Sequence, residues 1–188
     1  MSGRAELAIR HADAERDGAA CAAIYAPFVA ATAVSFEDEP PTAEEMARRI
    51  ASTSERYPWL LAQDGDGVAG YAYGAAHRER AAYRWACDVA VYVGERHRRQ
   101  GVGRALYGVL LELLERQGIQ VACAGITLPN DGSVALHEAC GFEPIGVYRR
   151  IGWKFGEWHD VWWWQLELAP ANEHAPAEPR PPVRLRGS

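Results

Sequence analysis

The stretch from Val91 to Arg104 constrains the fold more than any other part of the chain. It opens with valine and tyrosine, which are typical of strands, and passes through a loop with glycines at 94, 101 and 103. Beyond the loop, apolar residues recur at helical spacing, at Val102, Leu106, Val109, Leu110 and Leu113. This helix is expected to run through Gln117 and to end at Gly118. The sequence therefore predicts a strand, a glycine-containing loop and a helix in direct succession.

The loop between this strand and this helix has the composition of an anion-binding site. Gly101 and Gly103 allow a tight turn with exposed backbone amides, where a helix leaves its first N–H groups unpaired and its dipole favours negative charge. The arginines between positions 96 and 104 suit phosphate oxygens that lie beyond the reach of the amides. We expect the loop to hold a pyrophosphate. The alternative is a surface loop with a solvated run of charge.

Two other kinds of phosphate-binding loop do not fit this segment. The chain has no G-x-x-x-x-G-K-S/T sequence, and in a G-x-G-x-x-G pattern that starts at Gly101 the third glycine would fall on Leu106. Neither a P-loop nor a dinucleotide fingerprint is therefore expected.

Periodicity, turn residues and capping residues define the remaining elements. We expect a strand at 6–11, a helix that Asp13 caps and Pro27 ends, a loop at 28–41, and a helix of about a dozen residues opened by the capping-box spacing of Thr42 and Glu45. Further strands are expected at 59–63, 68–75, 83–93, 120–127, 145–153 and 159–168, and a short helix at about 131–140. This order predicts an α/β fold, with a mixed sheet and helices on both faces.

Length and composition narrow the class of protein. The 188 residues, of which 48% are hydrophobic, suit one domain over 1–168 followed by a proline-rich tail at 169–188. A net charge of -5 does not suggest a nucleic-acid partner, and no apolar run approaches the length of a membrane span. Without an apolar signal segment, the cytoplasm is the expected location. The cysteines at 21, 87, 123 and 140 lie far apart without ligand spacing, so reduced structural thiols and no metal are expected.

Two segments resemble the GCN5-related N-acetyltransferase (GNAT) superfamily. The family's pyrophosphate loop reads Arg/Gln-x-x-Gly-x-Gly/Ala, and this sequence matches it at Arg98, Arg99, Gln100, Gly101, Val102 and Gly103. A second family segment is matched by Asn130, Ser133, Leu136, Gly141 and Phe142. It departs from the family at His137, where many relatives carry tyrosine. The resemblance implies a GNAT-type fold with a mostly antiparallel central sheet, a splayed central strand pair, and acetyl-CoA as co-substrate.

A closer resemblance covers about residues 7 to 168. Stretches such as Arg56–Leu60, Leu128–Asp131 and Trp158–Val161 are similar to the phosphinothricin N-acetyltransferase subfamily. Some members of that subfamily act on methionine sulfoximine, methionine sulfone or other amino acids. The resemblance implies direct transfer of an acetyl group to the α-amino group of a small amino-acid-like molecule. It also implies a homodimer.

Two residues are expected to handle protons. An amino acid is an ammonium at neutral pH, so a base must accept its proton, and Asp88 in the strand before Val91 is the candidate, acting directly or through water. Relatives carry glutamate there. His137 stands where many relatives place the tyrosine that protonates the CoA thiolate, so it is expected to serve as acid or base. The alternatives are a carboxylate bonded to neighbouring backbone and a surface histidine. His77, His11 and His159 are interpreted as structural.

The resemblance also implies where the two substrates bind. Backbone amides at Val91, Tyr92 and Val93 would hold the thioester carbonyl, Arg98 to Arg104 the pyrophosphate, and Asn130 and Ser133 the pantetheine arm. For Asn130 the alternative is a turn after Pro129. From the residues, Arg78 and Arg80 could bind the acceptor's acidic groups. The aromatic residues that could form the pocket wall are Phe36, Tyr73, Tyr83 and Tyr92.

Two other functions remain open at this point. The chain could acetylate a peptide or another amine, although the segments 28–41 and 77–82 suit closure over a small ligand. It could also be a non-catalytic module that binds acyl-CoA. Neither a nucleic acid nor a membrane is an expected partner.

Overall fold

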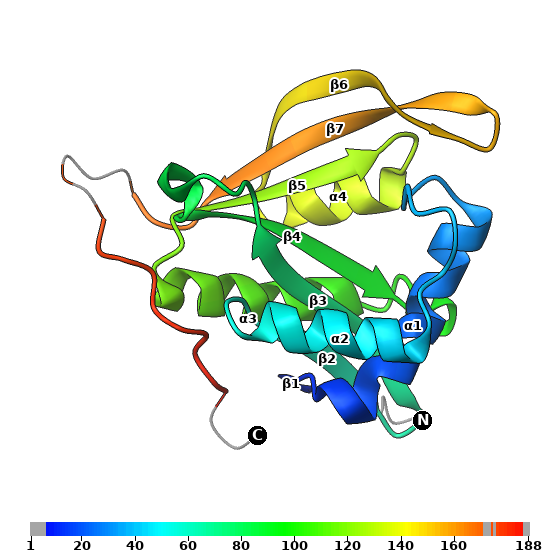
Figure 1. The fold of residues 1–188 in the computed structure, drawn as a ribbon, viewed down its shortest axis with the longest axis horizontal. Coiled ribbons are helices and arrows are strands. Elements are labelled where there is room, and N and C mark those ends of the chain that lie inside the picture. Colours follow the sequence, from blue (N-terminus) through cyan, green and yellow to red (C-terminus); the bar gives the residue numbers. More distant parts are fainter. Residues whose placement is uncertain (1–6, 171–173, 175, 186–188) are drawn as a thin grey trace.

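The computed structural model of the protein describes residues 7–170, 174 and 176–185. Seven strands form one sheet, with two helices against each of its faces (Figure 1). In chain order the elements are β1 (Ala8–His11), α1 (Ala14–Ala31), α2 (Ala43–Ser54), β2 (Trp59–Asp64), β3 (Gly67–Ala76), η1 (Ala81–Tyr83), β4 (Ala86–Val93), η2 (Glu95–His97), α3 (Val102–Gln117), β5 (Val121–Thr127), α4 (Asp131–Ala139), β6 (Glu143–Lys154) and β7 (Glu157–Glu167). The predicted class, α/β with a mixed and mostly antiparallel sheet, is confirmed.

The capping residues act as the sequence indicates. The hydroxyl of Thr42 accepts a hydrogen bond from the Glu45 N–H at 3.1 Å and so begins α2. Gly118 ends α3 in the left-handed conformation, with φ of 97°. These caps satisfy backbone groups that the helix ends leave without intrahelical partners.

Two predicted boundaries are wrong. Helix α1 does not end at Pro27 but continues to Ala31. The buried face of Gly18, Cys21, Tyr25 and Val29 continues past the proline, so burial of Val29 favours the added turn despite one lost backbone hydrogen bond. The strand expected from residue 83 begins only at Ala86, because residues 81–83 form a single 3-10 turn.

Two apolar clusters pack on opposite faces of the sheet. One contains Leu106, Leu110 and Leu113 of α3 and extends to partly buried residues of α4. The other joins α1 and α2 to the sheet around Trp59, Leu61 and Tyr71. Helix α3 therefore buries the stripe that helical periodicity predicts.

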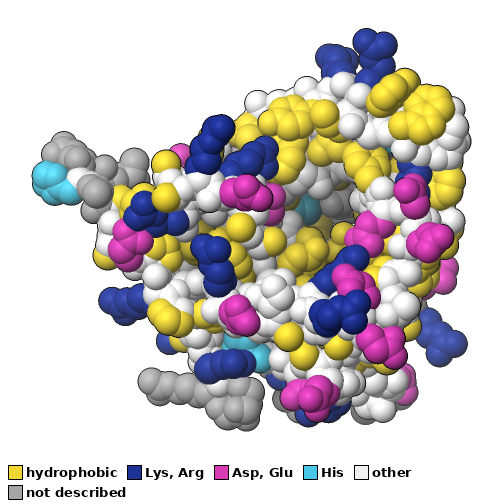
Figure 2. Space-filling model, in the orientation of Figure 1, with side chains coloured by type: hydrophobic (Ala, Val, Ile, Leu, Met, Phe, Trp, Pro, Cys, Tyr) yellow, Lys and Arg dark blue, Asp and Glu magenta, His cyan; other side chains and the backbone are white. Residues whose placement is uncertain are grey.

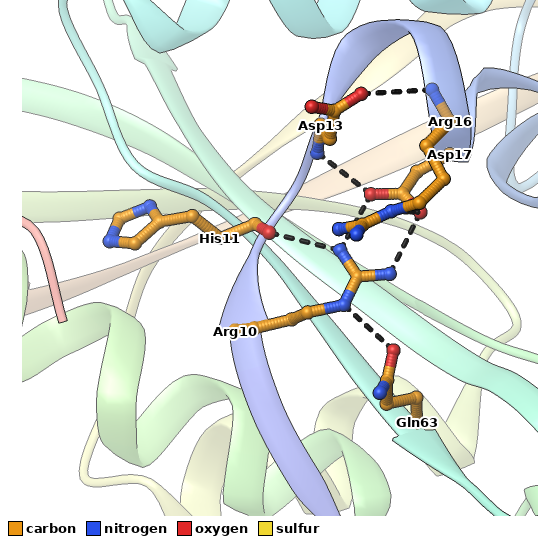
Figure 3. A network of polar contacts seen from close by, with 6 residues as sticks. All are labelled: Arg10, His11, Asp13, Arg16, Asp17 and Gln63. Carbon is orange, nitrogen blue, oxygen red and sulfur yellow. Dashed lines mark hydrogen bonds and ion pairs between the residues drawn. The ribbon is translucent and has the colours of Figure 1, made fainter. Parts of the chain in front are cut away.

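A buried ion pair fixes the start of α1 against the edge of the sheet (Figure 3). Arg10 on β1 donates to both carboxylate oxygens of Asp17, at 2.6 and 2.8 Å, and its Nε donates to the side chain of Gln63 on β2. The Asp17 side chain is 3% exposed and also accepts a bond from the Asp13 N–H. Burial would raise the pKa of Asp17, but the hydrogen bonds from Arg10, the Asp13 N–H and Arg16, together with the charge of Arg10, outweigh burial and leave that pKa below its usual value.

The hairpin of β6 and β7 reaches over to the loop that follows α1. The buried ammonium of Lys154 donates to the carbonyls of Val29 and Ser35, at 2.6 and 2.7 Å. A side chain at Gly152 would collide with Phe36, since an added carbon would lie 2.3 Å from that ring. The loop at 32–41 is thereby held beside the sheet face that α1 and α2 partly cover.

The proline-rich tail contacts the domain along its described part. The Trp85 indole donates to the Ala177 carbonyl, and the Arg180 N–H donates to the Gln117 carbonyl at the end of α3. The Leu185 N–H donates to His11 on β1. The division into a domain at 1–168 and a tail at 169–188 stays a prediction. None of the helices in the described ranges combines the length and apolar composition of a bilayer-spanning segment.

Candidate active site

Strands β4 and β5 separate in the middle of the sheet, and the separation creates a cleft. They pair in parallel only from Ala86 to Asp88, whereas β4 stays paired with β3 along Cys87 to Val93. The edge of β4 that faces β5 is therefore unpaired beyond Val89, and its backbone groups are available to a ligand. The cleft, of about 70 Å³, is lined by residues of both strands and by Tyr107, Asn130, Ser133 and His137. The predicted splayed strand pair is present, with Val91 to Val93 on its open edge.

The loop at 94–101 ends at the beginning of α3, as expected for an anion site. Gly101 precedes the helix with φ of 86°, in the left-handed region. The first helical bond runs from the Ala105 N–H to the Gly101 carbonyl, so the amides of Val102, Gly103 and Arg104 have no acceptor within the helix. The side chains of Arg98, Arg99, Gln100 and Arg104 are exposed around them. These groups together can hold a pyrophosphate.

Gly103 also has a packing role, in addition to the expected close approach of its backbone to the pyrophosphate. A carbon added there would lie 3.0 Å from the Leu136 side chain and 3.7 Å from Val93. It would point at α4 and β4, where α3 packs. By contrast, a carbon at Gly101 would meet nothing within 4 Å. Gly103 thus permits close packing of α3, and Gly101 supplies the turn beside the anion site.

His137 lies inside the protein and both of its ring nitrogens are engaged. It is 4% exposed, its Nδ1 lies 2.7 Å from the Ser133 carbonyl, and its Nε2 lies 3.1 Å from the Tyr107 hydroxyl. A carbonyl only accepts, so Nδ1 carries the proton and Nε2 accepts from Tyr107. Burial lowers the pKa of His137, and burial raises the pKa of Tyr107 well above its usual value. The cleft is therefore lined by a neutral imidazole and a protonated phenol.

Asp88 lies at the point where β4 and β5 separate, opposite Cys123 of β5. Its Oδ1 lies 2.6 Å from Nδ1 of His77, which follows β3. Single donor atoms of His77, Asp88 and Cys123 all lie within 4.8 Å of one another. Burial raises the pKa of Asp88, while the hydrogen bond from His77 acts to lower it. A partly buried carboxylate of this kind is suited to accept a proton.

Asn130, which is expected to bind the pantetheine arm of CoA, has its side-chain oxygen engaged within the protein. Its amide oxygen accepts a bond from the Ser133 N–H at 3.2 Å and caps α4. The amide nitrogen takes no part in that bond. Both Asn130 and Ser133 line the cleft. Capping and ligand binding are therefore compatible at Asn130.

The structure brings some of the predicted acceptor residues together. Tyr83 and Arg78 lie close to Asp88: the Tyr83 ring contacts the His77 ring at 5.9 Å, and the Arg78 guanidinium lies 5.9 Å from the Trp163 ring. Arg80 is exposed at the start of η1. Phe36 instead contacts the β6–β7 hairpin at Gly152 and His159.

The other two aromatic residues lie on the sheet face toward α1 and α2. The Tyr92 ring packs against Tyr25 and Phe28. Tyr73 stacks on Trp59 at 4.3 Å and lines a cavity of about 450 Å³ beside α2. This face of the molecule is hollowed at its centre, with hydrophobic side chains inside the hollow and charged side chains on its rim (Figure 2).

Two polar residues of this region were not expected to be functional. From the sequence, His77 is interpreted as structural. Its bond to Asp88 depends on the register of β3 and β4, which the sequence alone does not reveal. Tyr107 belongs to α3 and is fully buried. The sequence offered one signal for Tyr107: a tyrosine on a buried helix face needs a hydrogen-bond partner for its hydroxyl, which indicates a polar contact in the interior.

Comparison with known proteins gives consistent matches. An Acetyltransferase (GNAT) domain model matches residues 9–163. A phosphinothricin N-acetyltransferase of Streptomyces viridochromogenes is 42% identical over 95% of this chain and 94% of its own length. An L-methionine sulfoximine/L-methionine sulfone acetyltransferase of Salmonella typhimurium is 34% identical over 90% of this chain and 97% of its own. The crystal structure of a GNAT superfamily phosphinothricin acetyltransferase from Sinorhizobium meliloti with AcCoA superposes with a TM-score of 0.86, at 33% identity, covering 92% of this chain and 94% of that one.

Proposed function

The chain belongs to the GNAT family of acetyl-CoA-dependent N-acetyltransferases, and we propose that its acceptor is the α-amino group of a small amino acid that carries an oxidised phosphorus or sulfur. Phosphinothricin, methionine sulfoximine and methionine sulfone are acceptors of this type. The observation that carries the proposal is the cleft at the separation of β4 and β5, with Asp88 in the last residue pair before the two strands separate. The names of the relatives at 42% and 34% identity support the class of acceptor.

Acetyl-CoA binding is assigned to the loop and the cleft. The amides of Val102 to Arg104 and the exposed arginines around them would hold the pyrophosphate. The pantetheine arm would follow the open edge of β4, between Val91 to Val93 and Asn130. An N–H on that edge would then stabilise the charge that develops on the thioester oxygen.

Proton transfer is assigned to two residues, Asp88 at the point where β4 and β5 separate and Tyr107 in the cleft. Asp88 accepts the proton of the acceptor ammonium, directly or through one water, which leaves the neutral amine to attack the thioester carbon. The C–S bond then breaks, and the CoA thiolate needs a proton. We assign this proton to the hydroxyl of Tyr107, which turns its O–H from His137 Nε2, 3.1 Å away, to the thiolate, and the phenolate then takes the second proton that the attacking nitrogen loses as the amide forms. In this arrangement His137 positions the phenol that donates the proton.

The acidic groups of the acceptor are assigned to Arg78 and Arg80. Forked guanidinium donors match a carboxylate and a phosphinate or sulfone oxygen. The charge of Arg78 acts on Asp88, and Arg80 is exposed two residues further along, at the start of η1. Replacing Arg80 by alanine should raise the KM for these acceptors and leave the KM for acetyl-CoA nearly unchanged.

A panel of amines tests the acceptor class. Release of free CoA thiol would be followed with free amino acids, their sulfone, sulfoximine and phosphinate analogues, polyamines and short peptides. The proposal expects the oxidised analogues to give the highest kcat/KM. Faster turnover of peptides or polyamines would overturn the acceptor class, and binding of acetyl-CoA without turnover of any amine would favour a non-catalytic module.

We further propose that the β6–β7 hairpin forms a homodimer contact. Large apolar side chains on this hairpin are 39 to 60% exposed, namely Ile145, Val147, Tyr148, Ile151, Trp153, Phe155 and Trp158. Trp153 and Trp158 contact each other at 5.2 Å, and exposed apolar side chains gathered on one hairpin suit an interaction site. Light scattering at micromolar protein concentration should give twice the chain mass, and the mass of one chain would contradict the proposal.

A further inference from the structure

We propose that His77 is a positioning residue that holds Asp88 in place and keeps its carboxyl group ionised, ready to accept a proton. This inference rests on the proposed function, because it concerns the residue to which the acceptor's proton is assigned.

The backbone register brings the two side chains together. Ala75 of β3 pairs with Asp88 of β4, and His77 lies two residues beyond Ala75. Side chains alternate along an extended chain, so residues 75 and 77 share the face on which Asp88 lies. The imidazole Nδ1 lies 2.6 Å from the carboxylate Oδ1. This is the length of a strong, charge-assisted hydrogen bond.

Two aromatic side chains hold the imidazole edge toward the carboxylate. The Tyr83 ring contacts the His77 ring edge to face at 5.9 Å, with an interplanar angle of 62°. The Trp163 ring contacts it at 6.0 Å and 86°. Only 17% of the His77 side chain is exposed, compared with 33% for Asp88. The ring is thus more enclosed than the carboxylate that it contacts.

The environment of Asp88 makes such a donor necessary. Burial raises the pKa of Asp88 because it disfavours the charged carboxylate, whereas the hydrogen bond and charge of His77, and the charge of Arg78, lower it. Among the described residues, burial and also the charge of Asp88 raise the pKa values of Tyr57, Tyr73, Cys87 and Cys123, and the Tyr83 ring contacts the His77 ring. Thiols and phenols ordinarily ionise above neutral pH, so they add no charge in the acid range.

Loss of the His77 donor should shift the pH dependence of activity in one direction. Without the His77 donor, burial acts on Asp88 with less opposition, and the carboxyl group keeps its proton to a higher pH. The acid limb of kcat/KM should then move to higher pH. Activity should return in alkaline solution, where Asp88 ionises even without its partner.

Two substitutions separate this role from a merely structural one. His77→Phe keeps a ring against Tyr83 and Trp163 but removes the donor. His77→Asn keeps a donor, because the asparagine amide nitrogen occupies about the position of Nδ1. The matched control is His11→Asn, since His11 lies on β1 at the far edge of the sheet and its imidazole accepts a bond from the tail. The pH profiles of kcat/KM would be measured with methionine sulfone for the wild type and all three variants.

His77→Phe is expected to lower kcat/KM by about tenfold or more at about pH 6 and by less than about threefold at about pH 9. His77→Asn should restore most of the wild-type profile, and His11→Asn should match the wild type. An equal loss for His77→Phe at every pH, an unchanged profile, or a failure of asparagine to restore it would each overturn the inference. A wild-type enzyme that acetylates other amines instead would refute the proposed acceptor alone, and the same profiles would then be measured with the preferred amine.

Discussion

Replacing Gly101 by alanine tests whether the turn before α3 is the anion site. Gly101 has φ of 86° and ψ of -1°, a backbone conformation that residues other than glycine rarely adopt. Its surroundings are open, with nothing within 4 Å of an added carbon. The substitution therefore adds backbone strain without a steric collision, and it removes no side-chain contact.

The magnitude follows from the cost of the left-handed conformation. An alanine held there costs about 1–2 kcal/mol. Because no neighbour holds position 101, the loop should relax to a negative φ and lose the orientation of the amides that follow. The cost then appears in the affinity for CoA, as a loss of about 5- to 30-fold. The unfolding free energy should change by less than about 0.5 kcal/mol, as for other surface substitutions.

The assay is titration calorimetry with CoA, combined with chemical denaturation. Gly108→Ala is the matched control, since Gly108 lies in the same helix, also exposed and also with nothing within 4 Å. That variant should bind CoA like the wild type and gain about 0.5–1 kcal/mol in stability, because alanine favours a helix interior. If Gly101→Ala binds CoA with full affinity and normal stability, the assignment of the pyrophosphate to this turn is refuted.

Three further substitutions test other parts of the account. Tyr107→Phe should lower kcat by about 10²-fold with unchanged CoA affinity, because it removes the proton assigned to the thiolate; turnover above a third of the wild type would reject that role. Lys154→Met should reduce the unfolding free energy by about 2–4 kcal/mol in urea titrations, since two buried carbonyls lose their donor, and a neutral result would contradict this. Asp17→Asn should also destabilise the fold. The pKa of Asp17 is lowered from 3.8 by folding, so its contribution is complete above that value and is lost as pH falls through the folded-state pKa. The difference from wild type in denaturation should therefore shrink below about pH 4, and a difference independent of pH would contradict the ion pair.

Much of the fold could be predicted because its signals are local. Thr42 and Gly118 mark helix ends through their own backbone and side-chain chemistry, and Gly101 marks the turn that precedes α3. The helix end predicted at Pro27 was wrong because contacts with distant residues stabilise α1 beyond the proline, and a local rule does not include such contacts.

The candidate site was predictable only in part, for the same reason. Asp88 was found from its place in a strand before the loop. Its partner His77 and the pairing of Tyr107 with His137 depend on contacts between elements. Gly103 was expected in the anion loop, and its close approach to Leu136 of α4 could not be predicted because it depends on the packing of two helices.

The most direct test of the central claim is identification of the product by mass spectrometry. The purified protein would be incubated with acetyl-CoA and methionine sulfone or phosphinothricin, and free thiol and acetylated amino acid would be measured together. The account predicts one α-N-acetylated product for each thiol released, and a rate that falls by about 10²-fold or more in Asp88→Asn. Thiol release without an N-acetylated product, or full activity of Asp88→Asn, would contradict it.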